Sequence, residues 1–534
     1  MIREALASAV QDALVALGVD PLPTGISLER PGRREHGDWS SNVALATAKK
    51  AGRNPRELAT QLVDHLQAHP PAHVTKVELA GPGFVNFHLA PTWLHEILTD
   101  VLVGGVAGYA TPDLGHGTTV NVEFVSANPT GPVHAGHARG AAHGDSLARL
   151  LSRTGHVVTR EFYINDRGVQ MEKFGASLAA RKAGEAPPED GYQGAYITEW
   201  AQDLPDDADP VVWGEERALA DQREALGAFG VHFDVWYREL SLVASGAIEV
   251  TLAELLEKGV AFVEDGATWL RSTDYGDDKD RVLVKSDGQY TYLLPDIAYH
   301  RDKFSRATRL INVWGADHHG YVVRMKAAMA SLGHDPDELE VEIVQMVDLL
   351  KDGQPMKLSK RAGTVVELRD IVDEVGIDAA RLTYLLQSID SRQTVDLTEV
   401  ASQGMENPVF YVQMAHARIH GIVRKAAEAG FTRGALTDAD LSLLTHEREL
   451  DILRSLSELP DVVRLATKDR APHKVTTWVR ELAGTFHGFY HDCYVVGDGI
   501  SPELTEARLH LVESARIGLS IGLDLLGVSA PESM

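Results

Sequence analysis

The chain has 534 residues, of which 44% are hydrophobic and 24% charged, the composition of an ordinary globular protein. Its length predicts about three domains. The net charge of −26 argues against a generic nucleic-acid-binding protein, although local basic patches could still bind a polyanion. The single cysteine, Cys493, excludes a disulfide framework and a cysteine-based zinc site. The lack of a disulfide framework predicts a cytoplasmic protein. No window has the apolar length of a membrane helix, so we expect no membrane contact.

Residues 1–112 are predicted to form an N-terminal α+β domain. Apolar residues recur at helical spacing in residues 1–19, which predicts an amphipathic helix and not a signal peptide. Pro55 suits the first turn of a further helix. Residues 77–89 predict two strands around the turn Gly81-Pro82-Gly83.

Residues 113–370 alternate between predicted strands and helices, which indicates an α/β domain with a mostly parallel sheet. A mainly helical insertion at about 170–255 should interrupt the sheet, which resumes near a hairpin at Asp287-Gly288. Residues 371–534 predict helices without any strand, as in a separate helical bundle. The predicted strands of the α/β domain are residues 118–126, 157–163, 309–314 and 341–347, and its helices include residues 138–153 and those beginning at Pro295 and Tyr321.

A turn rich in proline and glycine, residues 128–133, connects the first of these strands to its helix. His134 and His137 fall on one side of the first helical turn. Imidazole donors beside the N–H groups of a helix N-terminus form an anion site suited to nucleotide phosphates. Further polar clusters, residues 292–296 and 315–319, lie near the ends of other elements of the sheet, where parallel α/β folds bind ligands.

A basic loop, residues 357–361, follows the last predicted strand of this domain. Alone, the histidine pair could be structural and the basic loop a solvated surface, but together and in this order they favour a functional site. The histidines could also join Asp317-His318-His319 in a metal site. Without cysteine or a clear carboxylate partner, we expect no metal centre there.

The two motifs resemble the HIGH and KMSKS motifs of class I aminoacyl-tRNA synthetases. Leu358 and Arg361 depart from the usual KMSKS pattern. The resemblance to bacterial-type arginyl-tRNA synthetases extends over nearly the whole chain. It is carried by residues 122–132, 163–170, 315–320 and 378–382 and by the ending Leu525-Leu526-Gly527-Val528.

This resemblance implies a Rossmann-like class I catalytic domain that activates L-arginine with ATP and Mg²⁺, without zinc. Arginyl-adenylate would form with release of pyrophosphate, and arginine would then pass to the 3'-terminal adenosine of tRNA(Arg). The C-terminal helical domain would bind the anticodon, and the N-terminal domain would contact the tRNA corner. We expect a monomer.

The resemblance also implies the site residues. The catalytic set is His134, His137, Lys357 and Lys360. The predicted ATP-binding residues are Pro129, Thr130, Gly131, His134, Gly136, His137, Gly315, Asp317, His318, Lys357, Ser359 and Lys360. The predicted arginine-binding residues are Glu123, Ser126, Asn128, His137, Tyr292 and Asp296. Asp296 would pair with the substrate's guanidinium while the Tyr292 ring packs on it.

Several alternatives stay open from the residues alone. Asp296 could lie at a helix N-terminus as a cap, Tyr292 could be a core strand aromatic, and Glu123 and Asn128 could be a polar pair at a strand edge. Other functions to consider are a cysteine or glutamate synthetase, a nucleotidylyltransferase and a catalytically silent tRNA-binding paralogue. The basic stretches 30–34, 418–425 and 464–474 could contact tRNA or be solvated helix faces.

Overall fold

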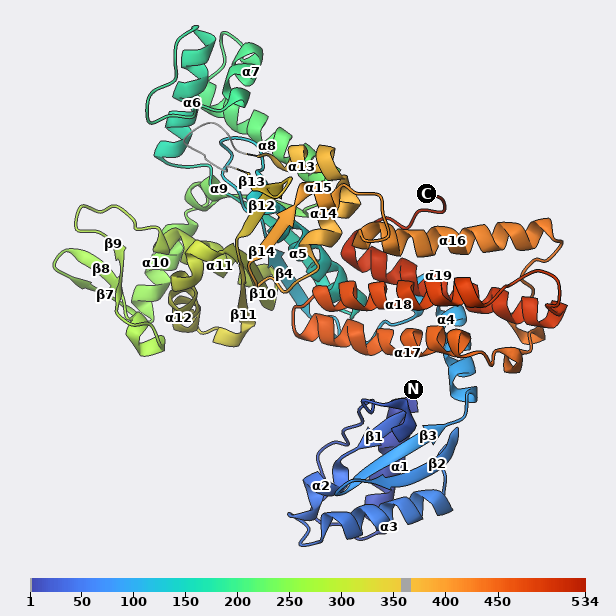
Figure 1. The fold of residues 1–534 in the computed structure, drawn as a ribbon. Coiled ribbons are helices and arrows are strands. Elements are labelled where there is room, and N and C mark those ends of the chain that lie inside the picture. The colour runs from blue at the N-terminus through green and yellow to red at the C-terminus, as the bar shows by residue number, and fades with distance from the viewer. Residues whose placement is uncertain (1, 357–365) are drawn as a thin grey trace. The chain divides into compact units, whose positions relative to one another are not determined.

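The computed structural model describes residues 2–356 and 366–534 (Figure 1). It divides into two compact units, one of residues 1–105, 425–457 and 488–514, the other of residues 106–424, 458–487 and 515–534. Among the described residues, no helix has both the length and the apolar character needed to cross a membrane.

The N-terminal module of the first unit confirms the predicted α+β arrangement. Pro55 occupies the first turn of its third helix, where the Asn54 side chain caps two backbone N–H groups. The short first strand was not predicted, because three residues are too few to show an alternation. The elements are α1 (Ile2–Ala16), β1 (Trp39–Ser41), α2 (Val43–Ala48), α3 (Pro55–Ala68), β2 (Val74–Ala80) and β3 (Phe84–Leu89), with an antiparallel sheet in the order β1-β3-β2.

The second unit contains a parallel sheet, as predicted, and it has five strands. Its strands are β4 (Thr119–Glu123), β5 (Val157–Ile164), β6 (Val235–Arg238), β10 (Arg309–Gly315) and β11 (Leu339–Val344). They are ordered β11-β10-β4-β5-β6, so the chain changes direction across the sheet between β4 and β10. The carboxyl ends of these two strands mark the place where open α/β sheets bind their ligands.

Two details of the predicted insertion are corrected. Residues 170–255 include β6, an edge strand of the main sheet, which has only four half-buried residues and therefore no clear periodicity. The strand at Arg281–Val284, β9, does not resume the main sheet. It belongs to a separate antiparallel sheet with β7 (Ala261–Glu264) and β8 (Ala267–Leu270). The turn at Asp287-Gly288 is confirmed, with Gly288 at a φ of 84°.

The C-terminal third is helical as predicted, with one exception. The expectation of no strand after residue 371 is wrong, because β14 (Gln393–Asp396) pairs in parallel with β12 (Val347–Lys351). β12 also pairs with β13 (Gln354–Pro355), directly before the predicted lysine loop. The helices are α13 (Leu368–Val375), α14 (Ile377–Tyr384), α15 (Leu397–Val400), α16 (Pro408–Glu428), α17 (Glu447–Lys468), α18 (His473–Asp492) and α19 (Pro502–Leu526).

Helix α5 (Ala135–Arg153), which follows β4, packs very closely on the residue after that strand. A Cβ at Gly144 would lie 2.3 Å from the ring of the buried Phe124. At Gly140, one turn earlier, a Cβ would lie 3.5 Å from the Val344 side chain, an ordinary van der Waals distance. Only the first of these glycines is therefore required by packing.

We expect Gly144→Ala to lower the free energy of unfolding by about 1–3 kcal/mol, because the methyl group would displace Phe124. Gly140→Ala is the matched control in the same helix, and it should be neutral or stabilising by up to about 1 kcal/mol. Urea unfolding of both variants measures the difference. Equal effects would show that α5 tolerates a side chain at either position.

Candidate active site

The two predicted histidines lie together at the N-terminus of α5. His134 is the N-cap residue, and its Nδ1 accepts the N–H of Gly136 at 3.1 Å. This bond means that a neutral His134 carries its ring proton on Nε2. The His137 ring lies beside it, with the ring centroids 3.8 Å apart. The helix start therefore combines two imidazoles with backbone N–H groups, an arrangement suited to an anion.

The turn that leaves β4 is conformationally strained. Val125 and Ser126 both have left-handed backbone conformations, with φ of 71° and 42°, which non-glycine residues seldom adopt. The Ser126 hydroxyl compensates by donating to Glu123 Oε1 at 3.0 Å and accepting the Tyr163 N–H at 3.1 Å. This turn directs the following loop across the carboxyl ends of the strands.

The loop itself is held by one side chain from each of the first three helices of the insertion. These helices, α6 (Val169–Lys182), α7 (Ala195–Asp203) and α8 (Pro210–Ala228), share a core of their own. The bonds are Asn128 Nδ2 to Gln170 Oε1 (2.8 Å), Tyr196 Oη to the Thr130 carbonyl (2.9 Å), and Gln222 Nε2 to the carbonyls of Asn128 (2.9 Å) and Gly131 (2.8 Å). Of the predicted ATP-binding residues here, Pro129 and Thr130 are buried.

The segment after the lysine loop pairs directly with the histidine segment. Ala135 N–H donates to the Val366 carbonyl at 2.9 Å, and Leu368 N–H donates to the Val133 carbonyl at 2.8 Å. The predicted residues Lys357, Ser359 and Lys360 lie outside the described residues. The chain that follows them is thus joined by backbone hydrogen bonds to the helix start that carries His134 and His137.

A buried arginine makes a second connection between these two parts of the site. Arg139 is 1% exposed and donates to the carbonyls of Gln345 (3.2 Å), Ser388 (2.6 Å) and Ser391 (2.6 Å). Burial lowers the pKa of its guanidinium, yet arginine keeps its charge in proteins. The residue thereby fixes the loops beside β12 and β14 to the histidine helix. One feature of the sequence could have predicted this role, because Arg139 is a long cationic side chain among the small residues at the start of α5.

Asp296 lies in the first turn of α11 (Leu293–Arg306), near the carboxyl ends of β4 and β10 where the strand order reverses. Its Oδ2 accepts the hydroxyl of Tyr321 at 2.6 Å. Tyr321 ends the η3 turn (Ala316–Tyr321) that follows β10, and sequence reasoning did not single it out. The alternative of Asp296 as a carboxylate at a helix N-terminus is right about its position, but the residue does not cap the helix. The N-cap position of α11 is Tyr292, and no side chain caps this helix.

The electrostatic surroundings of Asp296 favour a positively charged ligand. Burial raises the pKa of this carboxyl to about 7, against the lowering effect of the Tyr321 hydrogen bond, and the neighbouring Glu239 and Glu123 raise it further. In the described ranges of the chain, no cation pairs with the carboxylate. A half-buried carboxylate without a protein cation is stabilised by a cation that enters the site.

Tyr292 is 89% exposed, one helical turn before Asp296. The alternative of a core strand aromatic is therefore wrong. The contact of the Tyr292 ring with the guanidinium of a substrate stays a prediction.

Glu123 has a partner that the sequence analysis did not identify. At the carboxyl end of β4, its Oε2 accepts Lys303 Nζ at 2.8 Å, and Lys303 is fully buried. The lysine also donates to Asn312 Oδ1 at 2.6 Å. Because the charge of Glu123 is already compensated, its predicted contact with the amino acid stays a prediction.

His300 completes this buried network. Its Nδ1 donates to the Asp296 carbonyl at 2.8 Å, and its Nε2 accepts Asn312 Nδ2 at 2.7 Å. Burial and the nearby Lys303 lower the pKa of His300 to about 3, so the ring is neutral. Asp296, His300 and Lys303 lie at spacings of four and three residues, on one face of α11. That polar stripe was the available signal for the network.

The predicted residues Gly315, Asp317 and His318 are exposed at the carboxyl end of β10. A Cβ at Gly315 would lie 2.7 Å from Asp317 Oδ1. In residues 2–356 and 366–534, no three histidine, cysteine, aspartate or glutamate side chains are grouped as metal ligands.

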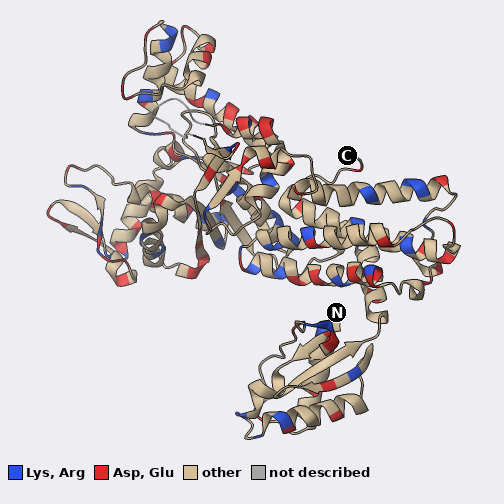
Figure 2. Cartoon of the chain, viewed as in Figure 1, with Lys and Arg blue, Asp and Glu red and all other residues tan. Residues whose placement is uncertain are grey.

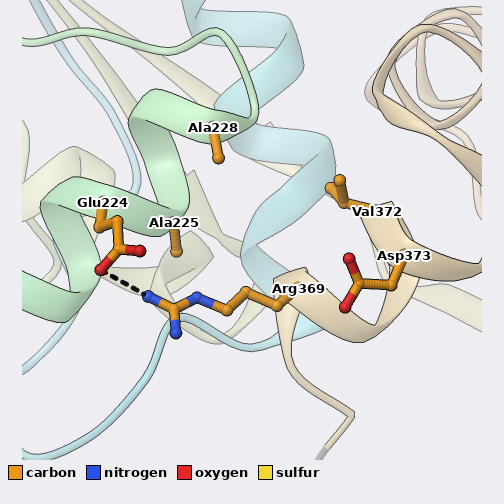
Figure 3. Close-up of a pocket in the computed structure, with 6 residues that line it drawn as sticks. All are labelled: Glu224, Ala225, Ala228, Arg369, Val372 and Asp373. Carbon is orange, nitrogen blue, oxygen red and sulfur yellow. Dashed lines mark ion pairs between the residues drawn. The ribbon is translucent and has the colours of Figure 1, made fainter.

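A separate cavity of about 250 Å³ lies between α8 and α13 (Figure 3). Figure 3 shows Arg369 of α13 reaching toward Glu224 of α8, with which it forms an ion pair of 3.3 Å. The remaining lining residues are Ala225, Ala228, Val372 and Asp373, and none of the six belongs to the predicted site.

The basic stretches considered as tRNA contacts are partly neutralised within the protein. Arg34 pairs with Glu447 and Asp451, Arg470 with Glu340, and Lys474 with Asp469. Figure 2 shows acidic and basic segments interspersed along α17. These contacts favour solvated helix faces at the paired positions.

The buried pair of Lys303 and Glu123 yields a stability prediction. Lys303→Met should lower the free energy of unfolding by about 3–5 kcal/mol, because it leaves an uncompensated buried carboxylate. Adding Glu123→Gln should restore part of this loss. Lys173→Met, which breaks the more exposed pair with Asp190, should change stability much less. Similar losses of stability in Lys303→Met and Lys173→Met would contradict a special role of the buried pair of Lys303 and Glu123.

Comparison with known proteins agrees with this architecture. Residues 1–89 match the model for the arginyl tRNA synthetase N terminal domain, residues 98–190 and 224–422 that for the tRNA synthetases class I (R) catalytic domain, and residues 412–534 that for the DALR anticodon binding domain.

Full-length relatives and a solved structure extend the comparison. An arginine–tRNA ligase of Frankia alni is 48% identical over 552 aligned positions, covering 100% of this chain and 99% of the relative. Arginine–tRNA ligase 1 of Halalkalibacterium halodurans is 44% identical, with 100% and 98% covered. The arginyl-tRNA synthetase structure from Thermus thermophilus has the same fold, with a TM-score of 0.79, 24% identity and 100% of both chains covered. This chain belongs to the arginyl-tRNA synthetase family of class I aminoacyl-tRNA synthetases.

Proposed function

We propose that this protein is an arginine–tRNA ligase whose substrates are L-arginine, ATP and tRNA(Arg). The observation that carries the choice of amino acid is Asp296, a half-buried carboxylate at the switch point of the sheet with a tyrosine hydroxyl as its partner. A guanidinium offers parallel N–H donors and a permanent charge to such a group. The names of the full-length relatives support the same substrate.

In the first half of the reaction, an oxygen of the arginine carboxylate attacks the α-phosphorus of ATP. The new bond joins that oxygen to phosphorus, and the bond from phosphorus to the bridging oxygen breaks, so that pyrophosphate leaves with the electron pair. Negative charge grows on the phosphate oxygens in the transition state. Donors from His134, His137 and the N-terminus of α5 would stabilise this charge in place of water.

Mg²⁺ would enter with ATP, since it retains waters and binds mainly through phosphate oxygens, whose charge it neutralises. No zinc is required by this chemistry. Lys357 and Lys360 would neutralise the departing pyrophosphate, with Ser359 beside them. The backbone pairing of residues 133–135 with residues 366–368 supports a role for that loop at the histidine helix. Pro129, Thr130, Gly131, Gly136, Gly315, Asp317 and His318 would contact the nucleotide.

In the second half, a ribose hydroxyl of the 3'-terminal adenosine attacks the carbonyl carbon of the adenylate, and AMP leaves. We assign anticodon binding to the C-terminal helices and contact with the tRNA corner to the N-terminal module, supported by the matching domain models. Aminoacylation of total tRNA with each of the twenty amino acids tests the proposal. Charging by cysteine or glutamate, or no charging at all, would refute it.

Asp296→Asn tests the recognition of arginine. It keeps the shape but removes the charge, so the KM for arginine should rise by about 10²-fold. The KM for ATP should change little, and binding of neutral citrulline should weaken much less than that of arginine. His137→Ala is the contrasting variant, with kcat lowered by about 10²-fold and arginine affinity nearly unchanged. Equal losses for arginine and citrulline would show that Asp296 only shapes the pocket.

The raised pKa of Asp296 predicts a pH dependence. Below its pKa of about 7 the carboxyl gains a proton and loses the charge that pairs with a guanidinium. The KM for arginine should therefore rise as the pH falls below 7, approaching tenfold per pH unit, and stay level above it. In Asp296→Asn this dependence should vanish. Measuring the KM for arginine from pH 6 to pH 9 checks this dependence. If KM varied with pH equally in the wild type and in Asp296→Asn, the titrating group would be a residue other than Asp296.

A further inference from the structure

Tyr321 connects the nucleotide side of the site to the amino-acid side. It ends the η3 turn that contains Asp317 and His318, and it is the N-cap residue of α12 (Val322–Leu332). Its hydroxyl donates to Asp296 Oδ2 at 2.6 Å, a short bond typical of a hydroxyl donating to a carboxylate.

The ring of Tyr321 is held on two sides. The Trp314 ring lies with its centroid 6.0 Å away, and the Arg324 guanidinium lies 5.1 Å from the ring centroid. The ring also packs against the apolar cluster beneath α11. Burial raises the pKa of the Tyr321 hydroxyl, the adjacent Asp296 raises it further, and the hydroxyl therefore keeps its proton. Tyr321 is thus a fixed donor with one acceptor.

We propose that Tyr321 is a positioning residue for arginine recognition, which rests on the proposed function. By occupying Oδ2 of Asp296, the hydroxyl fixes the plane of the carboxylate and stabilises its charged form. The carboxylate then meets the substrate's guanidinium in one orientation. The residue acts through Asp296 and needs no contact with the substrate of its own.

The groups around Asp296 make this hydrogen bond important. The titratable and charged groups that face it are Glu239 at the start of α9 (Glu239–Ala244), Glu123 at the end of β4, Tyr163 in β5, Tyr321, and His300 and Lys303 of its own helix. Glu239 pairs with Arg167 and Glu123 with Lys303. His300 is neutral and donates to a backbone carbonyl. Tyr321 is therefore the described side chain that donates directly to the Asp296 carboxylate.

The test is Tyr321→Phe in the full-length enzyme, with steady-state aminoacylation measured from pH 6 to pH 9. At pH 7 the KM for arginine should rise about tenfold, because a hydrogen bond to the charged carboxylate is lost. The pH below which KM rises should move upward by about one unit. The KM for ATP and kcat at saturating arginine should stay close to those of the wild type. Isothermal titration with arginine alone provides a direct readout of binding.

Tyr299→Phe is the matched control, because Tyr299 donates to another buried carboxylate, Glu161, at 2.8 Å and lies on the same helix as Asp296. It should lower the melting temperature without shifting the pH profile for arginine. In an Asp296→Asn background, Tyr321→Phe should add little further loss, since the two residues act as one unit.

An unchanged pH profile in Tyr321→Phe, or the full tenfold loss in the Asp296→Asn background, would overturn the inference and leave Tyr321 as a packing residue. A wild-type enzyme that fails to charge tRNA with arginine would refute the proposed function instead.

Discussion

A buried lysine ammonium lies beneath the switch point of the parallel sheet, and the geometry of the site depends on its compensation. Lys303 reaches from α11 to Glu123 on β4 and to Asn312 on β10, two residues that face each other in the register of these strands. A buried charge is tolerated only when its partners are well placed, so the helix cannot rotate or slide without losing both contacts. Asp296 lies two turns earlier on α11, so the same contacts fix its position near the carboxyl ends of the strands.

The pairing of the neighbouring carboxylates with cations of the protein explains why Asp296 is suited to a ligand. Glu123 is compensated by Lys303, Glu161 by Arg306, and Glu239 by Arg167. Asp296 receives only a hydroxyl from the described residues, and its carboxyl has a raised pKa as a result of burial. Of these four carboxylates, three are thus compensated by cations of the protein, and Asp296 is left for a cation from outside.

The sequence predicted the long, regular parts of this architecture. Strands β4, β5, β10 and β11 and helix α5 carry enough residues for their apolar period to be visible. The alternation of strands and helices predicted a parallel sheet, but not the order of its strands. The three- and four-residue strands β1, β6, β7, β8 and β14 were missed because strands of that length show little period. The equally short β9 was predicted because of the Asp287-Gly288 turn beside it. His134, His137 and Asp296 were found from motif and chemistry. Tyr321, Gln170 and Gln222 were not, since their partners lie 25, 42 and 94 residues away.

The loop before α5 has a further consequence for protein engineering. Its shape depends on Gln170, Tyr196 and Gln222, each from a different helix of the insertion. A truncated catalytic core that retained every strand of the sheet but replaced these helices by a short linker would leave the Thr130 and Gly131 carbonyls without these donors. Miniaturisation of this enzyme would therefore have to supply two substitute donors, for Tyr196 and Gln222, and one substitute acceptor for the Asn128 amide.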